Sequence, residues 1–393
     1  MYKNNPSKVC DVLVDSSVDV IELHKAIKDV VKTVLASEPN STWASVADEC
    51  LDVSAICGGI TNVLFLVSQL NSPEKVIVRL YGNGTEAFID RTVENLVFAK
   101  LSELEIGPTF YGRFKNGRVE GYLPALALES NQMGDTDIYP YIAAAVAEMH
   151  GLNFEDIHTG CDWLWRKIRH FLQLSADKCP DVNAMLGAKM AEEVAWLEAF
   201  VAERTQKAKT KDKHDLVVQG QLFGLQQVLC HNDLLSGNIL FRPLPEATPQ
   251  QQQEFQKSSN SNRQVFLIDY EYTAYNYRAF DLANHFSEHC GFEYDFERTL
   301  PTPSAMRAFL RRYMEALLSQ GMSADVASCG YLSVVLILSL TSETIQWLLL
   351  ASHLFWGSWA LVQAGCSSID FDYAGYAQRR FDALLVHKTK LCN

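Results

Sequence analysis

The spacing of apolar positions in the first third of the chain predicts a helix followed by a sheet. Residues 20–35 place apolar side chains near helical spacing, which favours a helix. Short runs of β-branched and apolar residues, separated by Gly, Asn, Ser and Pro, follow it and predict strands. The expected strands cover residues 52–57, 62–67, 75–81, 110–114 and 118–123, with a helix at 90–104 between the third and the fourth.

The remainder of the chain has a mostly helical pattern. Helices are expected at 141–150, through 160–205 and from 303 onward, with two short buried strands around residues 228–241 and 266–269. The lysine-rich stretch 205–213 predicts a loop or a frayed helix end. The Gln- and Ser-rich stretch 249–264 predicts a disordered insertion.

One segment, residues 344–369, has no Asp, Glu, Lys or Arg and is long enough to span a bilayer. Gln346, His353 and Gln363 interrupt it, and polar groups are costly inside lipid. The segment therefore favours two buried helices and no membrane span.

The order of elements predicts an α+β protein of two lobes. An antiparallel sheet lobe would cover residues 1–122 and a mainly helical lobe residues 123–393. The formal charge of −13 argues against a nucleic-acid partner. Ten scattered cysteines without metal-site spacing, and a beginning without an apolar signal segment, favour reduced thiols and a cytoplasmic location.

A polar stretch between two apolar runs carries the chemistry that phosphoryl transfer needs. His231 begins it, and Asp233 is followed five residues later by Asn238, the spacing of kinase catalytic loops. Asp269 ends the next short strand. This set offers a carboxylate to orient an acceptor hydroxyl, and an amide oxygen and a second carboxylate for Mg²⁺. Turn chemistry alone explains a single Asp-x-x-x-x-Asn, but the ordered set favours a kinase.

The predicted sheet supplies candidates for holding a nucleotide. A glycine pair at a hairpin tip lets backbone approach a phosphate, and neighbouring polar residues can donate hydrogen bonds. Arg79, at the third strand, could reach phosphates, and Glu94 of the following helix could pair with it. Ordinary turn chemistry and surface charges are the alternative. The candidates in this region are Gly58, Gly59, Thr61, Asn62, Arg79 and Glu94.

Several motifs together resemble the choline/ethanolamine kinase family, from about Gly58 to Leu385. Residues 228–241 look like its phosphotransferase loop, and residues 268–286 resemble its signature. Residues 352–359 and 369–373 are similar as well. The resemblance implies a protein-kinase-like fold, ATP and Mg²⁺ as cofactors, and phosphorylation of the hydroxyl of ethanolamine or choline for phospholipid synthesis.

The resemblance also implies roles for particular residues. Asp233 would orient the acceptor hydroxyl, and Asn238 and Asp269 would hold Mg²⁺. Gly58, Gly59, Thr61, Asn62 and Arg79, with Arg79 positioned by Glu94, would contact the ATP phosphates. Gly121, Tyr122, Leu123 and Leu235 would lie near the nucleotide. Tyr272, Glu288, Trp356, Trp359 and Tyr376 would surround the amino-alcohol head group.

The last set also has a physical argument of its own. Trp356 and Trp359 are three residues apart, so they share a helix face, and indole faces attract an ammonium group. Glu288 would add a countercharge. For an isolated helix, two tryptophans at this spacing indicate packing in the core. Their place in a chain with a kinase loop favours the binding function.

The preferred alcohol is less clearly marked than the family. Residues 60–62, residues 81–86 and Cys230 resemble ethanolamine kinases, whereas residues 118–120 suit choline kinases equally well. His289 stands where choline kinases usually carry tryptophan, so a smaller cage that favours ethanolamine is expected. Another small-molecule kinase and an inactive kinase-fold binding module remain alternatives. A homodimer is usual for the resembled family.

Overall fold

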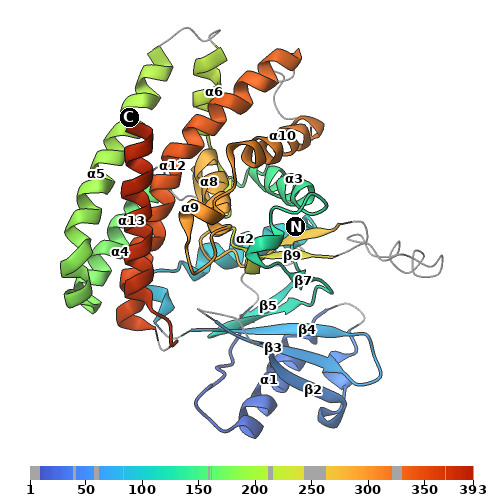
Figure 1. Ribbon diagram of the computed structural model, residues 1–393. Helices are drawn as coiled ribbons and strands as arrows, with labels where there is room; N and C mark the ends of the chain where they lie inside the picture. The colour runs from blue at the N-terminus through green and yellow to red at the C-terminus, as the bar shows by residue number, and fades with distance from the viewer. Residues whose placement is uncertain are drawn as a thin grey trace. The chain divides into compact units, whose positions relative to one another are not determined.

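A computed structural model describes residues 9–38, 41–56, 62–82, 84–157, 160, 162–210, 216–242, 263–320, 330–367 and 369–392 (Figure 1). Its internal contacts divide the chain into two compact units. Unit 1 comprises residues 1–125 and 242–271, and unit 2 comprises residues 126–241 and 272–393. Each unit is built differently and is described by itself.

Unit 1 is organised on a six-stranded sheet with strand order β1-β5-β6-β4-β3-β2. Its strands are β1 (Val9–Cys10), β2 (Leu51–Ile56), β3 (Asn62–Gln69), β4 (Lys75–Tyr81), β5 (Phe110–Phe114) and β6 (Gly117–Gly121). Its α-helices are α1 (Val20–Leu35) and α2 (Arg91–Glu103), and short 3₁₀ helices cover Trp43–Ser45, Asp48–Cys50 and Thr85–Ala87. The short strand β10 (Val265–Leu267) also belongs to this unit. Antiparallel pairing joins every neighbouring pair of the six-stranded sheet except β1 and β5, which are parallel.

Helix α1 covers one face of this sheet (Figure 1). The opposite face carries charged side chains. Asp19 caps α1 by accepting hydrogen bonds from the Ile21 and Glu22 amides. Val76 and Val78 of β4 belong to the core beneath α1. Because side chains alternate along a strand, Arg79 of β4 points to the opposite face.

Unit 2 is mainly helical. Its helices are α3 (Tyr139–His150), α4 (Trp163–Lys178), α5 (Pro180–Thr210), α6 (Leu216–Gly224), α8 (Arg278–Glu288), α9 (Phe296–Thr299), α10 (Pro303–Ser319), α12 (Gly330–Cys366) and α13 (Tyr373–Cys392). Its strands β8 (Gln227–Cys230) and β11 (Ala274–Tyr277) pair antiparallel, as do β7 (Leu126–Ala127) and β9 (Ile239–Phe241). Short 3₁₀ helices cover Ser130–Gln132 and Ser236–Asn238.

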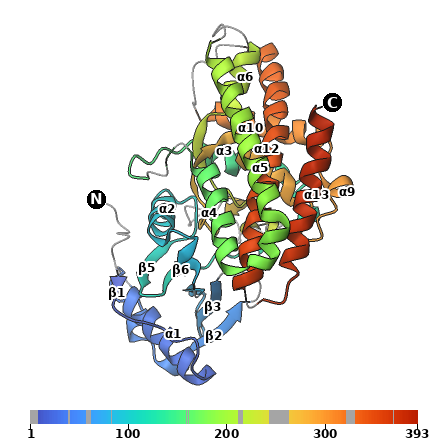
Figure 2. The ribbon, with the colours of Figure 1, turned by 90° about the vertical axis from the view of Figure 1, so that its left-hand side faces the viewer.

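The long helix α12 is the centre of unit 2. It packs against α4, α5, α6, α8 and α13, and Figure 2 shows α5, α12 and α13 side by side. The prediction of two helices at 344–369 is wrong, because one helix runs from Gly330 to Cys366. Gly357 does not break it: a Cβ there would lie 2.8 Å from Met190 Cε, so the glycine admits a close neighbour.

The apolar part of α12 is interior. Glu343–Cys366 is long and apolar enough to cross a bilayer by length and composition, yet 94% of its most apolar window is buried inside the structure. Such burial is typical of the core helix of a folded domain. It agrees with the expectation that this segment does not span a membrane.

Other expectations differ in their boundaries. Residues 242–271 group with unit 1, whereas the predicted division placed them in the helical lobe. The reason is packing: Tyr270 stacks edge-on against Phe98 of α2, with ring centres 5.6 Å apart. Helix α5 extends to Thr210, within the lysine-rich stretch for which a loop or a frayed helix end was predicted. Most of the predicted insertion at 249–264 lies outside the described residues.

Candidate active site

The predicted catalytic loop connects β8 to β9 in unit 2 and is deeply buried. His231, Asn232 and Leu234 have no exposed surface, and Asp233 keeps 7%. Asn232 has a φ of 66°, a left-handed conformation that few residue types adopt readily. The backbone thus turns sharply just before Asp233, and surrounding contacts must hold it there.

Helix α8 supplies many of those contacts. Asp281 accepts hydrogen bonds from the His231 amide at 2.8 Å and from the Asn232 amide at 2.7 Å, one to each carboxylate oxygen. Asn284 donates to the Asn232 carbonyl at 3.3 Å. Asp281, Asn284, His285 and Glu288 follow the spacing i, i+3, i+4 and i+7, which places them along one face of the helix. One rigid element therefore fixes the loop backbone.

Asp281 is itself oriented by a buried relay of polar groups. Arg278 donates to the Tyr313 hydroxyl at 2.5 Å, and this hydroxyl lies 2.7 Å from His150 Nδ1. His150 Nε2 lies 3.0 Å from Asp281 Oδ2. Because the Asp281 carboxylate can only accept, Nε2 of the neutral His150 carries the proton and donates to it, which leaves Nδ1 to accept from the tyrosine hydroxyl. Burial lowers the pKa of His150, so this neutral form is the stable one.

The side chain of Asn238 is aligned by Asp233. Its amide nitrogen donates both to the Asp233 carbonyl and to Asp233 Oδ2, each at 2.9 Å. With both N–H groups engaged, the amide oxygen is left to face a ligand. Mg²⁺ takes oxygen ligands, so the amide oxygen of Asn238 suits the predicted role of this residue as a metal ligand.

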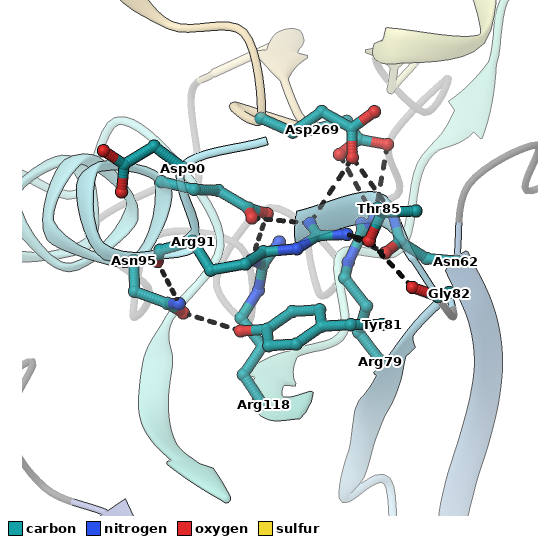
Figure 3. Close-up of polar contacts among 12 residues, drawn as sticks. Asn62, Arg79, Tyr81, Gly82, Thr85, Asp90, Arg91, Asn95, Arg118 and Asp269 are labelled. Carbon is teal, nitrogen blue, oxygen red and sulfur yellow. Dashed lines mark hydrogen bonds and ion pairs between the residues drawn. The ribbon is translucent and has the colours of Figure 1, made fainter. Parts of the chain in front are cut away.

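Unit 1 gathers a cluster of three arginines and four carboxylates. Figure 3 shows its three arginines together with Asp269. Arg79 of β4 and Arg118 of β6 are cross-strand partners, an arrangement that repels without intervening anions. Glu120 lies between them, 3.4 Å from Arg79 Nη2 and 2.7 Å from Arg118 Nε. The other members are Arg91, Glu94, Asp269 and Glu271.

Arg79 has a different partner from the one predicted. Its Nη1 lies 3.2 Å from both carboxylate oxygens of Asp269, which has a φ of 67°. Glu94 instead pairs with Arg118 and, at 2.7 Å, with Arg91. The expected direct pair of Arg79 and Glu94 is therefore wrong. Arg118, on the neighbouring strand, forms the ion pair with Glu94 that the sequence analysis expected of Arg79.

The pKa values of the cluster follow from burial and charge. Burial alone would raise the pKa of Glu94, but Arg118 and Arg91 overcome it and hold the pKa at about 2. Burial, reinforced by Asp269 and Glu94, raises the pKa of Glu271 to about 8. Burial therefore favours the neutral form of Glu271, whereas the two arginines keep Glu94 charged.

The predicted amino-alcohol residues form a nearly continuous aromatic series in unit 2. Tyr272 and Trp356 meet edge to face at 5.5 Å, as do Trp356 and Trp359. The series continues from Trp359 through Tyr373 and Phe371 to Tyr376. Trp356 also donates its indole N–H to Asn284 Oδ1 at 2.7 Å. The same helix α8 thus positions the catalytic loop and part of the aromatic series.

Glu288 does not stand beside these rings as an uncompensated charge. Arg380 of α13 lies 3.4 Å from its carboxylate, and both side chains are buried. The pKa of Glu288 is raised by burial, with Arg380 opposing the shift. Asp233 is among the groups that raise the pKa of Tyr376, after burial and Glu288. The aromatic series and the Asp233 carboxylate therefore lie within electrostatic reach of each other.

The other residues predicted to bind the nucleotide lie in several different places. Gly58, Gly59 and Thr61 lie outside the described residues. Asn62 is 6% exposed and bonds Arg91 and Glu271, so its side chain belongs to the charged cluster. Gly121 ends β6, where its amide donates to the Thr109 carbonyl at 2.8 Å. Tyr122 is 37% exposed, and Leu123 is half-buried.

Leu235 directly precedes the 3₁₀ turn of Asn238, and its carbonyl accepts the Asn238 amide at 3.0 Å. Its place beside the nucleotide, like that of Gly121, Tyr122 and Leu123, stays a prediction.

Sequence reasoning missed the supporting residues around each group. Asp281, Asn284 and His285 were visible as an Asp-x-x-Asn-His pattern, whose spacing indicates one helix face. Arg118 and Glu120 alternate along β6, which indicates one sheet face. The relay through His150 and Tyr313 had no local signal, because its members are 163 residues apart.

Comparison with known proteins identifies the family of the chain. The choline/ethanolamine kinase family model matches residues 53–385. The chain is 31% identical over 372 residues to a protein of Dictyostelium discoideum named "Probable ethanolamine kinase A", covering 92% of this chain and 91% of that protein. It is 29% identical over 370 residues to the mouse protein named "Choline/ethanolamine kinase", covering 89% and 83%.

Among solved structures, the choline kinase of Cryptosporidium parvum shares the fold with a TM-score of 0.69 at 23% identity, over 93% of this chain and 96% of that one. This likeness supports the predicted protein-kinase-like fold with a sheet lobe and a helical lobe. No comparison favours the two alternatives that the sequence left open. The chain belongs to the choline/ethanolamine kinase family.

Proposed function

We propose that this chain transfers the γ-phosphoryl group of ATP to the hydroxyl of ethanolamine and accepts choline less well. The observation that carries the proposal is the anchored loop, which fixes the Asp233 carboxylate and the Asn238 amide against each other at 2.9 Å. Family membership supports the reaction class. The product, a phosphorylated amino alcohol, would serve phospholipid synthesis.

Catalysis in this proposal rests on positioning and charge. Asp233 accepts the hydrogen bond of the acceptor hydroxyl and orients its oxygen toward phosphorus. Asn238 keeps the Asp233 carboxylate in one rotamer, because it binds Oδ2 and the carbonyl of the same residue. Arg79, on the sheet of unit 1, offers a permanent positive charge to the nucleotide phosphates.

Mg²⁺ would fit the oxygen donors that each unit offers. Unit 2 presents the amide oxygen of Asn238, and unit 1 presents the carboxylate of Asp269, whose side chain is 21% exposed. Oxygen donors of these two kinds suit Mg²⁺, which would neutralise phosphate charge when bound. Arg79 shares the Asp269 carboxylate, so a cation bound there would compete with this arginine for the same oxygens.

The preference for ethanolamine rests on the charge and size of the aromatic site. Its glutamate, Glu288, is already paired with Arg380, so the ring faces provide the attraction for the ammonium. A primary ammonium is small and can donate hydrogen bonds to nearby acceptors. His289 stands where the resembled choline kinases usually carry tryptophan, which leaves one fewer large aromatic ring for a quaternary ammonium.

We further propose a cytoplasmic location and a homodimer. The location is supported by six cysteines with free thiols among those that the structure describes. The dimer is supported only by family resemblance. Sedimentation of the purified protein measures the dimer directly, and a single monomeric species at micromolar concentration would exclude it.

Initial rates with Mg·ATP and either alcohol test the proposed reaction. We expect turnover with both, and a higher kcat/KM for ethanolamine. Turnover with neither alcohol, while ATP still binds, would refute the assigned acceptor. A higher kcat/KM for choline would refute only the preference.

A further inference from the structure

Asn284 of α8 is fully buried and uses both ends of its side-chain amide in hydrogen bonds. Its Oδ1 accepts from Trp356 Nε1 at 2.7 Å and from Ser352 Oγ at 2.9 Å, both on α12. Its Nδ2 donates to the Asn232 carbonyl at 3.3 Å. An indole N–H can only donate and a carbonyl can only accept, so this orientation of the amide satisfies both neighbours. One side chain therefore joins the helix that carries the tryptophans to the residue directly before Asp233.

A second connection closes this path into a circuit. Asn232 Nδ2 donates to the Tyr272 carbonyl at 2.9 Å, and the Tyr272 ring meets the Trp356 ring edge to face at 5.5 Å. Together with Asn284, these residues form a closed circuit of contacts, and none of the four is more than 6% exposed. Buried side chains that are packed from two sides have little freedom to shift. The circuit therefore fixes the position of Trp356 relative to the backbone of the loop.

Arg380 of α13 holds the circuit on the side of α12. Its Nη2 donates to the Ser352 carbonyl at 3.3 Å and to Ser352 Oγ at 3.2 Å. Because an arginine only donates, the single hydroxyl hydrogen of Ser352 is directed to Asn284 Oδ1. The Asn284 oxygen thus receives two hydrogen bonds of fixed direction. Loss of Asn284 would leave a buried indole N–H and a buried hydroxyl without this acceptor.

The circuit connects the two ends of the proposed acceptor site. Trp356 would hold the ammonium group, and Asp233, next to Asn232, would orient the hydroxyl. After burial and Glu288, Asp233 adds to the raised pKa of Tyr376, so the Asp233 carboxylate lies near the aromatic series. A fixed separation between an ammonium site and a hydroxyl site suits one length of carbon chain between nitrogen and oxygen.

We propose that Asn284 is a positioning residue that sets the length of amino alcohol that the site accepts, by fixing Trp356 relative to the loop of residues 231–238. This inference rests on the proposed function, in which one acceptor reaches both Trp356 and Asp233. Asn284 has no exposed surface, so it acts through its neighbours and not by contact with the acceptor. Ethanolamine should match the fixed separation, whereas 3-amino-1-propanol, which adds one methylene, should not.

The ratio of the kcat/KM values for ethanolamine and 3-amino-1-propanol, measured on the full-length protein with Mg·ATP, tests the inference. We expect the wild type to prefer ethanolamine about 10–100-fold. Asn284→Ala should lower this preference about tenfold, because the ring and the loop can then move apart and admit the longer alcohol. Ser352→Ala removes only one of the two donors to Asn284 and should lower it about threefold. A merely structural defect would lower both kcat/KM values alike and leave their ratio unchanged.

Ser358→Ala is the matched control for Ser352→Ala. Ser358 is also a fully buried serine of α12, but its hydroxyl donates to the Phe355 carbonyl of the same helix, at 2.9 Å. This variant should keep the wild-type ratio. Without substrates, deuterium uptake in residues 231–238 should be faster in Ser352→Ala than in Ser358→Ala. Equal uptake would contradict the link between α12 and the loop.

Trp356→Phe tests the same link from its other end, because it keeps a ring but removes the indole N–H. Both it and Asn284→Ala break one connection, so the double variant should change the ratio no more than the larger of the two single changes. Additive changes would show that the two residues act separately and would overturn the inference. If Asn284→Ala does not fold, Trp356→Phe and Ser352→Ala carry the test of the ratio.

Failure of this inference is distinguishable from failure of the proposed function. A wild type that phosphorylates ethanolamine, with the same preference in Asn284→Ala and Ser352→Ala, would overturn the positioning role alone. A wild type that uses both alcohols equally well would overturn the selection of length. Turnover of neither alcohol by the wild type would refute the proposed function, and this inference with it.

Discussion

The two units hold their functional groups by opposite means. In unit 1, Arg79 and Asp269 belong to a buried cluster in which charges compensate one another. In unit 2, Asp233 stands on a backbone that α8 fixes, because Asp281 accepts hydrogen bonds from two amides of the loop and Asn284 donates one to a carbonyl. Charged partners can be exchanged when a charged ligand arrives, whereas a hydrogen-bonded backbone stays in place. The comparison suggests an adaptable phosphate-binding side and a preorganised acceptor side.

The largest effect should come from the carboxylate that the loop presents. Asp233→Asn keeps the size of the side chain but removes its ability to accept a proton or to orient the hydroxyl strongly. We expect kcat to fall about 10²–10⁴-fold. Thermal unfolding should stay close to that of the wild type. Retained turnover would mean that the loop positions a different group.

The anchor of the loop should show a mixed effect on stability and on turnover. Asp281→Asn replaces one carboxylate oxygen with an N–H₂ group, which cannot accept a hydrogen bond from a backbone amide. It also removes the negative charge that strengthens the hydrogen bond of the other oxygen. We expect unit 2 to lose about 2–4 kcal/mol of unfolding free energy and kcat to fall with little change in either KM. Asp382→Asn, at an exposed site on α13, is the control. Equal behaviour of the two variants would contradict the anchoring role.

Low pH should destabilise unit 2 more than unit 1. Burial lowers the pKa of five histidines in unit 2, to about 4 in His285 and His387 and to about 3 in His289, and below the usual value in His150 and His353. Each is neutral in the fold but takes a proton in the unfolded chain below about pH 6.5. The stability that they contribute is therefore present above pH 6.5 and is lost as the pH falls toward their folded pKa values.

We expect the stability of unit 2 to fall as the pH drops below about 6.5, because the unfolded chain takes up protons that these buried histidines refuse. Glu94 of unit 1 has a pKa of about 2, lowered from 4.5. The stability that its charge contributes is therefore lost only as the pH falls below about 4.5. Hydrogen exchange at pH 5.5 should thus increase in unit 2 before unit 1. The reverse order would contradict the difference between the units.

A substitution of Arg79, whose partners are the carboxylates of the charged cluster, should have a moderate effect on ATP binding. Arg79→Lys keeps the charge but cannot contact Asp269 and Glu120 together. We expect the KM for ATP to rise about tenfold while the KM for ethanolamine is nearly unchanged. Arg113→Lys, on β5 of the same sheet, should change neither. A selective rise in the KM for ethanolamine would refute the phosphate-binding role.

The smallest effect is expected in the aromatic series. Trp359→Phe keeps a ring face but reduces its attraction for a cation, so the KM for ethanolamine should rise about three- to fivefold. Stability should change little through hydrogen bonding, because Trp359 Nε1 has no partner within the described residues. Equal increases in both KM values would indicate that Trp359 only packs.

Local pattern predicted some parts of the molecule better than others. Helix α1 was predicted with the bounds that the structure shows, since its apolar spacing and the Asp19 cap are both local signals. The loop from His231 to Asn238 was recognisable because the spacing of Asp233 and Asn238 is that of kinase catalytic loops. The partner of Arg79 was not, because the choice between Glu94 and Asp269 depends on which strand Arg118 occupies. The continuity of α12 depends on Met190, which fills the space beside Gly357.

The central claim is that Asp233 directs phosphoryl transfer to the hydroxyl of an amino alcohol. Phosphorus NMR of a reaction with Mg·ATP and ethanolamine tests it most directly, because it distinguishes a phosphate ester on oxygen from free phosphate. We predict one ester signal with the wild type and none with Asp233→Asn over the same time. Free phosphate alone with the wild type, or ester formation by Asp233→Asn at the wild-type rate, would contradict the account.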